Sequence, residues 1–271
     1  MNGILNCLAM REEIMKKLIT TSLLVAAMFS QQTLAETFNS GVGKVALVEL
    51  FSSEGCSSCP PAEKKLSQLV DDPQLFKTFV PVAFHVDYWD RLGWADRFAT
   101  PEYTARQYSL SSSGHQRSVY TPNFIISGEE WKGFFRGHSI QGAVEAFSKS
   151  EVGNLQIDYQ ALASQHQVKA VFSPGERFVA DTSKPLILSV APLGMGLESN
   201  VRRGENRNKQ LKHEFVALDW QKIAMTFENN QWVATLNLSK DAHQEQAQAI
   251  SAWVSNESNL APIQAVGGFI Q

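Results

Sequence analysis

The chain has 271 residues, of which 44% are hydrophobic and 19% are charged, as in folded globular proteins. Its formal net charge of -3 provides no basic footprint for nucleic acid and no polybasic patch for a membrane surface. This length accommodates one large domain or two ordinary ones.

The N-terminal segment has the pattern of an export signal. A lysine pair at 16–17 precedes the apolar run 18–29, which is too short for a comfortable membrane span, and small residues lead to Ala35. We therefore expect residues 1–35 to be a signal peptide cleaved after Ala35, which places the protein in the periplasm or outside the cell. Met15 is an alternative start, and an N-terminal membrane anchor is the competing interpretation. After cleavage we expect no attachment to a membrane.

One pair of cysteines remains after that cleavage, since Cys7 lies in the removed segment. Cys56 and Cys59 follow the apolar run 45–51 and directly precede the prolines at 60–61, which suit the first turn of a helix. In an oxidising compartment such a pair forms a disulfide or cycles through one. Because the bond closes almost no loop, it contributes little to stability, which favours a redox role.

Up to residue 152, helix and strand patterns alternate. Residues 36–43 read as a flexible leader. The predicted elements are then a strand at 44–51, a helix from 59 to 71, strands at 80–86, 123–126 and 131–135, and helices at 101–110 and 140–148. Thr100 and Ser139 are the expected caps of the last two helices.

After residue 153, alternating apolar and polar residues predict an antiparallel sheet. The predicted strands are 155–159, 168–172, 185–190, 223–227, 232–238 and 249–254, with one candidate helix at 241–248. The order of elements before residue 152 is that of the thioredoxin fold. We therefore predict an α/β thioredoxin-like domain at residues 36–152, followed by an all-β, sandwich-like domain at residues 153–271.

The thiol pair falls where a helix begins, and that position has chemical consequences. Unpaired backbone N–H groups and the positive end of the helix dipole stabilise a thiolate there and lower its pKa. We assign Cys56 as the attacking thiol and Cys59 as the resolving thiol.

Thr121 and Pro122 form the second predicted element of the site. In thioredoxin-like folds a cis-proline faces the thiol pair, and the residue before it offers its backbone to an extended substrate. Pro122 precedes a predicted strand, so we assign both residues to substrate positioning. A trans proline at a strand edge is the alternative.

Several segments together resemble an exported thioredoxin-like family filed as domain of unknown function 1223. They are Glu49 to Ala62, His85 to Asp90, Gly93-Trp94, Arg106-Gln107, Val119 to Pro122 and Gly204-Glu205-Asn206. The resemblance implies a thioredoxin-like domain with a β-rich companion and no established reaction. True thioredoxins have a tryptophan where this chain has Gly55 and a Gly-Pro spacer where it has Ser57-Ser58, so the direction of electron flow stays open.

Glu49 is a candidate proton acceptor for the resolving cysteine, although its offset from the pair is one residue longer than in thioredoxins. The alternative is a surface carboxylate or a pair with Lys44. A candidate groove is formed by His85, Asp87, Tyr88, Trp89 and Trp94. A satisfied core position is the alternative for His85, and packing against the thioredoxin core is the alternative for the aromatic residues.

The sequence therefore favours a thiol–disulfide oxidoreductase that acts on protein thiols or disulfides with an unidentified redox partner. It needs no organic cofactor, because the electrons reside on the thiol pair. One alternative is a non-catalytic binding module with a structural disulfide. Another is copper or zinc held by Cys56, Cys59 and either His85 or His115. The polar turn 204–206 is either a solvated loop or a dock between the two halves.

Overall fold

The computed structural model describes residues 35–147, 149–162, 165–176, 178, 184–239, 247–257 and 260–270. Within those residues, no helix is both long enough and apolar enough to span a membrane. The predicted signal peptide, apart from Ala35, lies outside the described residues.

The thiol pair lies next to two parallel strands. The strands β2 (Ala46–Ser52) and β3 (Phe79–His85) are fully buried and pair in parallel. The helix α2 (Pro60–Ser67) connects them, and α3 (Pro101–Ser112) follows β3. The strand β4 (Asn123–Ile126) pairs antiparallel with β2, and β5 (Glu129–Glu130) pairs with β4. The side-by-side order is therefore β3-β2-β4-β5.

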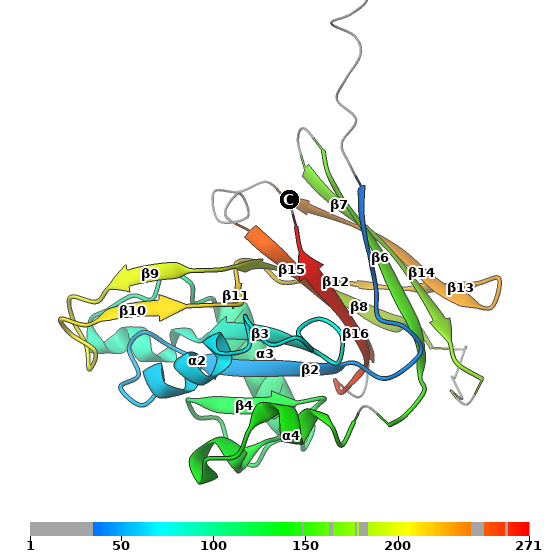
Figure 1. Ribbon diagram of the computed structural model, residues 1–271. Helices are drawn as coiled ribbons and strands as arrows, with labels where there is room; N and C mark the ends of the chain where they lie inside the picture. The colour runs from blue at the N-terminus through cyan, green and yellow to red at the C-terminus, as the bar shows by residue number, and fades with distance from the viewer. Residues whose placement is uncertain are drawn as a thin grey trace, which may run out of the picture. The chain divides into compact units, whose positions relative to one another are not determined.

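Later strands extend this sheet beyond β3. The strand β11 (Val216–Ala217) pairs with β3, and β8 (Leu186–Gly194), β15 (Ala247–Asn256) and β16 (Pro262–Phe269) continue outward in that order. The strand β12 (Gln221–Ala224) also pairs with β8. Figure 1 shows these late strands running on from the early ones. Residues from both sides of position 152 thus share one nine-stranded sheet, while the division into two domains stays a prediction.

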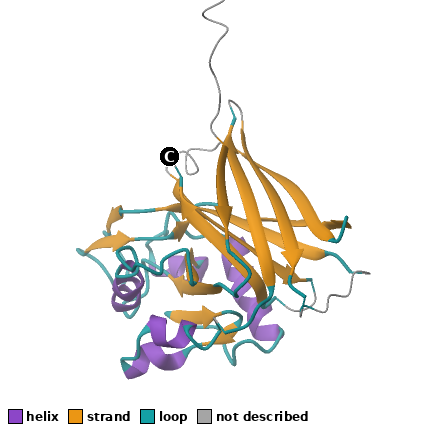
Figure 2. Cartoon of the chain, turned by 45° about the vertical axis from the view of Figure 1, so that its right-hand side comes forward, coloured by secondary structure: helices purple, strands orange, loops and turns teal. Residues whose placement is uncertain are grey.

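A second, five-stranded sheet has the order β1-β6-β7-β14-β13. Its strands are β1 (Ala35–Asn39), β6 (Gly153–Ala161), β7 (Gln165–Pro174), β14 (Gln231–Ser239) and β13 (Thr226–Glu228). Figure 2 shows these long strands on the side of the molecule away from the helices. Alternate residues of β6 are buried, as the sequence pattern predicts, and they pack with Leu188 and Val190 of β8 in one apolar core.

The strands β9 (Leu197–Asn200) and β10 (Gln210–His213) form a separate two-stranded hairpin. Figure 1 shows it as an arm that reaches from the β-rich part toward α2, and β10 contacts that helix. The sequence analysis did not predict this hairpin, although it singled out the turn 204–206 within it.

Two local predictions are wrong. The expected flexible leader contains β1, which pairs with β6 because Phe38 has an apolar core to pack against. The expected strand at 131–135 is a 3-10 helix, η2 (Lys132–Arg136). It curls because Trp131 and Phe134 both pack on Phe124 rather than alternating across a sheet.

The helix boundaries are closer to expectation. Thr100 accepts a hydrogen bond from the N–H of Tyr103 at the start of α3, and Ser139 caps α4 (Ile140–Val144) in the same way through Gly142. The candidate helix at 241–248 lies outside the described residues as far as residue 246, and its last two residues belong to β15.

Candidate functional site

The thiol pair lies at the N-terminal end of α2, as predicted. Cys59 is the N-cap residue, and its carbonyl accepts the N–H groups of Ala62 and Glu63 at 2.9 and 3.1 Å. A disulfide joins Cys56 to Cys59 across a Cα–Cα distance of 5.4 Å, within the usual range. Both cysteines have 0% exposed surface, so another molecule can reach the sulfur atoms only after the residues that cover them are displaced.

Thr121 and Pro122 lie at the same edge of the sheet as the thiol pair. Phe51 pairs with Asn123, so the residues just after β2 lie beside those just before β4. The peptide bond between Thr121 and Pro122 is cis, which confirms that part of the prediction.

Trp89 connects the two segments. Its indole N–H donates to Oγ1 of Thr121 at 2.8 Å. Its Cβ lies only 3.0 Å from the position that a Cβ on Gly55 would occupy. Residue 55 is therefore a glycine because Trp89, from the 3-10 helix η1 (Asp87–Leu92), fills the adjacent space.

The β9–β10 hairpin covers the thiol segment with the turn that the sequence analysis singled out. The Asn206 side-chain amide donates to the carbonyls of Glu54 and Cys56 at 2.9 and 2.8 Å, and Asn206 is fully buried. A carboxylate oxygen of Glu205 accepts from the backbone N–H of Ser57 at 3.1 Å and from its hydroxyl at 2.6 Å. We call residues 204–207 the cap. It is a dock between the halves rather than a solvated loop.

Below the cap lies a cluster of buried acidic and imidazole groups. His213 of β10 contacts the Glu63 carboxylate through Nδ1 and the Glu54 carboxylate through Nε2, the latter at 3.2 Å. Ser52 donates its hydroxyl to the other oxygen of Glu63, and Trp94 donates its indole N–H to Glu54 at 2.6 Å. Burial lowers the pKa of His213, but the two carboxylates outweigh it and raise that pKa to about 10.

His85 occupies the same cluster. Its Nδ1 lies 2.7 Å from Asp96, and its ring centroid lies 5.1 Å from that of His213. Burial lowers the pKa of His85, but the Asp96 charge outweighs it and holds that pKa above its usual value. Burial raises the pKa of Glu63, yet the charge on His213 holds it below the usual glutamate value. His85 is fully buried, so it lines no surface groove and takes the core alternative.

Glu49 points to the opposite side of the sheet from Ser52 and Glu63. Its carboxylate accepts from Nε of Arg106, on α3, at 2.6 Å, and both side chains are buried. Glu49 is therefore neither a surface group nor a partner of Lys44. The proton-acceptor role assigned to it stays a prediction, and the buried carboxylate on the α2 side of the sheet belongs to Glu63, a residue of α2 itself.

The other predicted groove residues are half-buried and tied to neighbours. Asp87 accepts from the Thr104 hydroxyl at 2.6 Å, and Tyr88 donates to Gln107 at 3.2 Å. Burial raises the pKa of Tyr88 to about 12. These contacts fix η1 against α3, so at least part of the aromatic segment packs on the core.

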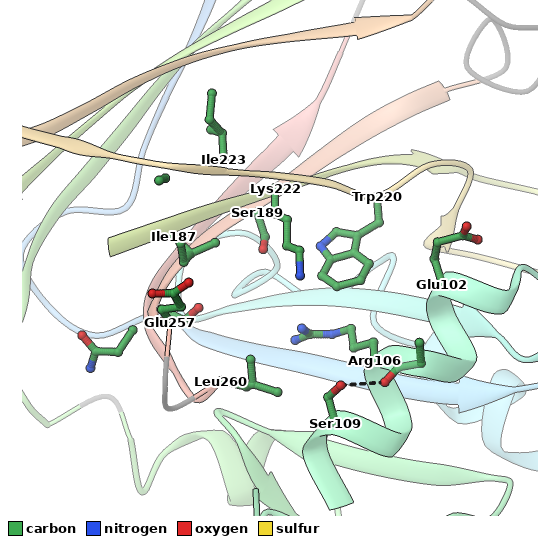
Figure 3. A pocket seen from close by; sticks show the side chains of 14 residues that line it. Glu102, Arg106, Ser109, Ile187, Ser189, Trp220, Lys222, Ile223, Glu257 and Leu260 are labelled. Carbon is green, nitrogen blue, oxygen red and sulfur yellow. Dashed lines mark hydrogen bonds between the residues drawn. The ribbon is translucent and has the colours of Figure 1, made fainter. Parts of the chain in front are cut away.

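A cavity of about 500 Å³ lies elsewhere, between α3 and the strands β8 and β12. Figure 3 shows Arg106 and Trp220 facing each other there, with the guanidinium carbon 5.0 Å from the ring centroid. Its lining carries charges of both signs, including Lys222 and Glu257, and includes neither cysteine.

This protein therefore has a disulfide-bonded thiol site that is assembled from both halves of the chain. The first half supplies the Cys56–Cys59 pair and the Thr121-Pro122 segment, and the second half supplies the β9–β10 hairpin. The model of the protein family of unknown function DUF1223 matches residues 47–255, so the chain belongs to that family.

Two solved structures share the fold. Protein AGR_C_4864 from Agrobacterium tumefaciens is 24% identical, with a TM-score of 0.60 over 83% of this chain and 94% of that one. HBP35 of Porphyromonas gingivalis is 15% identical, with a TM-score of 0.59 over 84% of this chain and 76% of that one. No curated protein matches the sequence.

Sequence reasoning missed most of the buried cluster. Glu54, Glu63, Asp96 and His213 come from four separate segments, and nothing local in the sequence marks them as partners. The one available signal was Gly204-Glu205-Asn206, a polar turn in the family resemblance that had no assigned chemistry.

Proposed function

We propose that this protein is an exported thiol–disulfide oxidoreductase whose redox group is the Cys56–Cys59 pair. The observation that carries the proposal is the disulfide at the N-terminal end of α2, where the helix N-terminus favours a thiolate. Export is proposed from the sequence pattern of residues 1–35.

We further propose that residues 36–152 form a thioredoxin-like unit. The support is the chain order β2-α2-β3-α3-β4-β5-α4 and the sheet order β3-β2-β4-β5, with β2 and β3 parallel. The cysteines follow the first of these strands, as in that fold.

Exchange would proceed through a mixed disulfide. In the reduced protein the Cys56 thiolate attacks one sulfur of a substrate disulfide, and the other substrate sulfur leaves as a thiolate. The Cys59 sulfur, once deprotonated, then attacks Cys56 Sγ and releases the second substrate thiolate. The substrate has gained two electrons, and the Cys56–Cys59 disulfide is restored. The reverse sequence oxidises a substrate dithiol.

The cap must open for either direction, because both cysteines are buried in the oxidised form. Asn206 and Glu205 hold the cap to the thiol segment through hydrogen bonds to residues 54, 56 and 57. Their release would expose the attacking sulfur. Thr121, beside the opened site, would then position the substrate backbone.

Trapping tests the proposal. We expect Cys59→Ser protein to accumulate a mixed disulfide through Cys56 with exported client proteins, visible on non-reducing gels and lost on reduction. The matched control, Cys56→Ser, leaves only the buried Cys59 and should trap far less. An absence of adducts on Cys59→Ser, with the variant folded, would contradict the proposal.

The burial of both sulfur atoms favours a second candidate, a binding module with an inert structural disulfide. That candidate predicts a reduction potential below about −300 mV, whereas exchange catalysts span about −270 to −120 mV.

A further inference from the structure

The buried histidines His85 and His213 each direct one ring nitrogen to a carboxylate other than that of Glu63. His85 Nδ1 lies 2.7 Å from Asp96, and His213 Nε2 lies 3.2 Å from Glu54. Histidines that ligate a metal ion almost always give their other ring nitrogen to a carboxylate, carbonyl or water in this way. The arrangement leaves His85 Nε2 without a partner and turns His213 Nδ1 toward the Glu63 carboxylate, so these two nitrogens are the ones that would face an ion.

A third donor completes the set. Ligand atoms of Glu63, His85 and His213 all lie within 4.8 Å of one another, and all three residues are buried. His85 Nε2 is buried and has no hydrogen-bond partner among the described residues. A buried imidazole nitrogen without a partner is costly, which is a reason to look for a ligand at that position.

The charges of the cluster also suit a cation. The carboxylates of Glu54, Glu63 and Asp96 face two imidazoles in a space closed to water. Three carboxylates with two protonated imidazoles have a formal charge of −1, and a divalent cation that takes the place of the two protons leaves the same total. Two nitrogens with one carboxylate is a ligand set of zinc and of non-haem iron, whereas calcium and magnesium prefer oxygen ligands.

We propose that Glu63, His85 and His213 form a binding site for a divalent transition-metal ion of the zinc type. Glu63 comes from α2, His85 from the end of β3, and His213 from β10. The ion therefore links the capping hairpin to the helix that carries the thiol pair. The site uses neither cysteine and does not depend on the proposed exchange activity.

The test uses the full chain, stripped with a chelator and titrated with Zn²⁺ by calorimetry and with Co²⁺ by visible absorption. We expect one ion per chain, a higher melting temperature with Zn²⁺, and a Co²⁺ spectrum of nitrogen and oxygen ligation without thiolate charge-transfer bands. Binding should be unchanged in the Cys56→Ser/Cys59→Ser protein and in the exposed-histidine control His138→Gln.

Three variants locate the ion. His213→Gln and Glu63→Gln should weaken binding by more than 100-fold. Asp96→Asn alters the partner of His85, which also accepts the backbone N–H groups of Glu54 and Phe98, and should weaken binding by about 10- to 100-fold. Circular dichroism of the metal-free variants shows whether they fold, and Asp96→Asn keeps the shape of the site if the others do not. The proposal is overturned if the folded wild-type chain binds no ion stoichiometrically, if binding requires the cysteines, or if folded His213→Gln binds as tightly as wild type.

Discussion

The two sides of this molecule bury different chemistry. The core beneath the five-stranded sheet is apolar, built from residues such as Leu155, Phe172 and Leu188. The layer around β2 and β3 also buries ionisable groups, among them Glu49, His85 and Arg106. Apolar burial stabilises a fold wherever it occurs, whereas buried charge carries a desolvation penalty that only good pairing offsets.

The contrast indicates a division of roles. Apolar packing supplies stability on both sides, because the residues around β2 and β3 form an apolar core of their own. The buried charges of the layer around β2 and β3 add little net stability but fix the positions of groups around Cys56 and Cys59. Substitutions on the two sides should therefore differ in what they change.

The largest expected effect is on stability in the apolar core. Phe172 is fully buried, with Phe178 and Trp232 rings centred 5.6 and 6.4 Å away. We expect Phe172→Ala to lower the free energy of unfolding by about 3–5 kcal/mol in a denaturant titration. The rate of disulfide reduction in the native protein should not change. If Phe172→Ala lowers the free energy of unfolding by less than about 1 kcal/mol, this apolar core does not have the stabilising role assigned to it.

The next effect tests the buried pair of Glu49 and Arg106. Arg106→Met leaves an unpaired buried carboxylate and should cost about 3 kcal/mol by the same titration. The double variant Glu49→Leu/Arg106→Met removes both charges and should recover most of that loss. If the double variant is as unstable as the sum of the single variants, the two side chains do not act as a pair.

A smaller effect is expected at the cap. Asn206→Ala removes the side-chain donor from the carbonyls of Glu54 and Cys56, although the Cys56 carbonyl keeps the N–H of Cys59. The change should make opening easier by roughly 1–2 kcal/mol. Reduction of the Cys56–Cys59 disulfide by dithiothreitol should then be about tenfold faster under conditions where opening limits the rate. The neighbouring exposed Arg207→Ala is the matched control. Equal rates in all three proteins would show that the cap does not guard the pair.

The smallest effect concerns acid. The Ser57 hydroxyl and amide, as hydrogen-bond donors, hold the pKa of Glu205 below its usual value. The contact between the Glu205 carboxylate and Ser57 is therefore fully formed at pH values above the usual glutamate pKa. It weakens as the pH falls through the lowered pKa of Glu205. We expect reduction by a phosphine to speed up in that acid range for the wild type. Glu205→Gln should lack this pH dependence, and a persistent acid-induced rise in the variant would assign it to another group.

The part of the site that comes from one continuous segment was predictable from sequence. Cys56, Cys59 and the following prolines lie within six residues, so the strand, the thiol pair and the helix start are local signals. Pro122 was accessible because the predicted thioredoxin-like order of elements assigns a cis-proline to that position. The β6 and β7 alternation likewise revealed strands with one buried face.

The buried cluster was not predictable, because sheet pairing and hairpin docking bring its members together. His213 meets Glu63 across 150 positions of sequence, and no periodicity encodes that contact. Glu49 was assigned from its offset to the cysteines alone. Strand alternation puts its side chain on the face away from α2, where it pairs with Arg106 instead.

The reduction potential of Cys56–Cys59 tests the central claim most directly. It is measured on the full chain by equilibration against glutathione or dithiothreitol buffers. We predict a value between about −270 and −120 mV, the range of known exchange catalysts. A value below about −300 mV would mark an inert structural bond and would contradict a role in thiol–disulfide exchange.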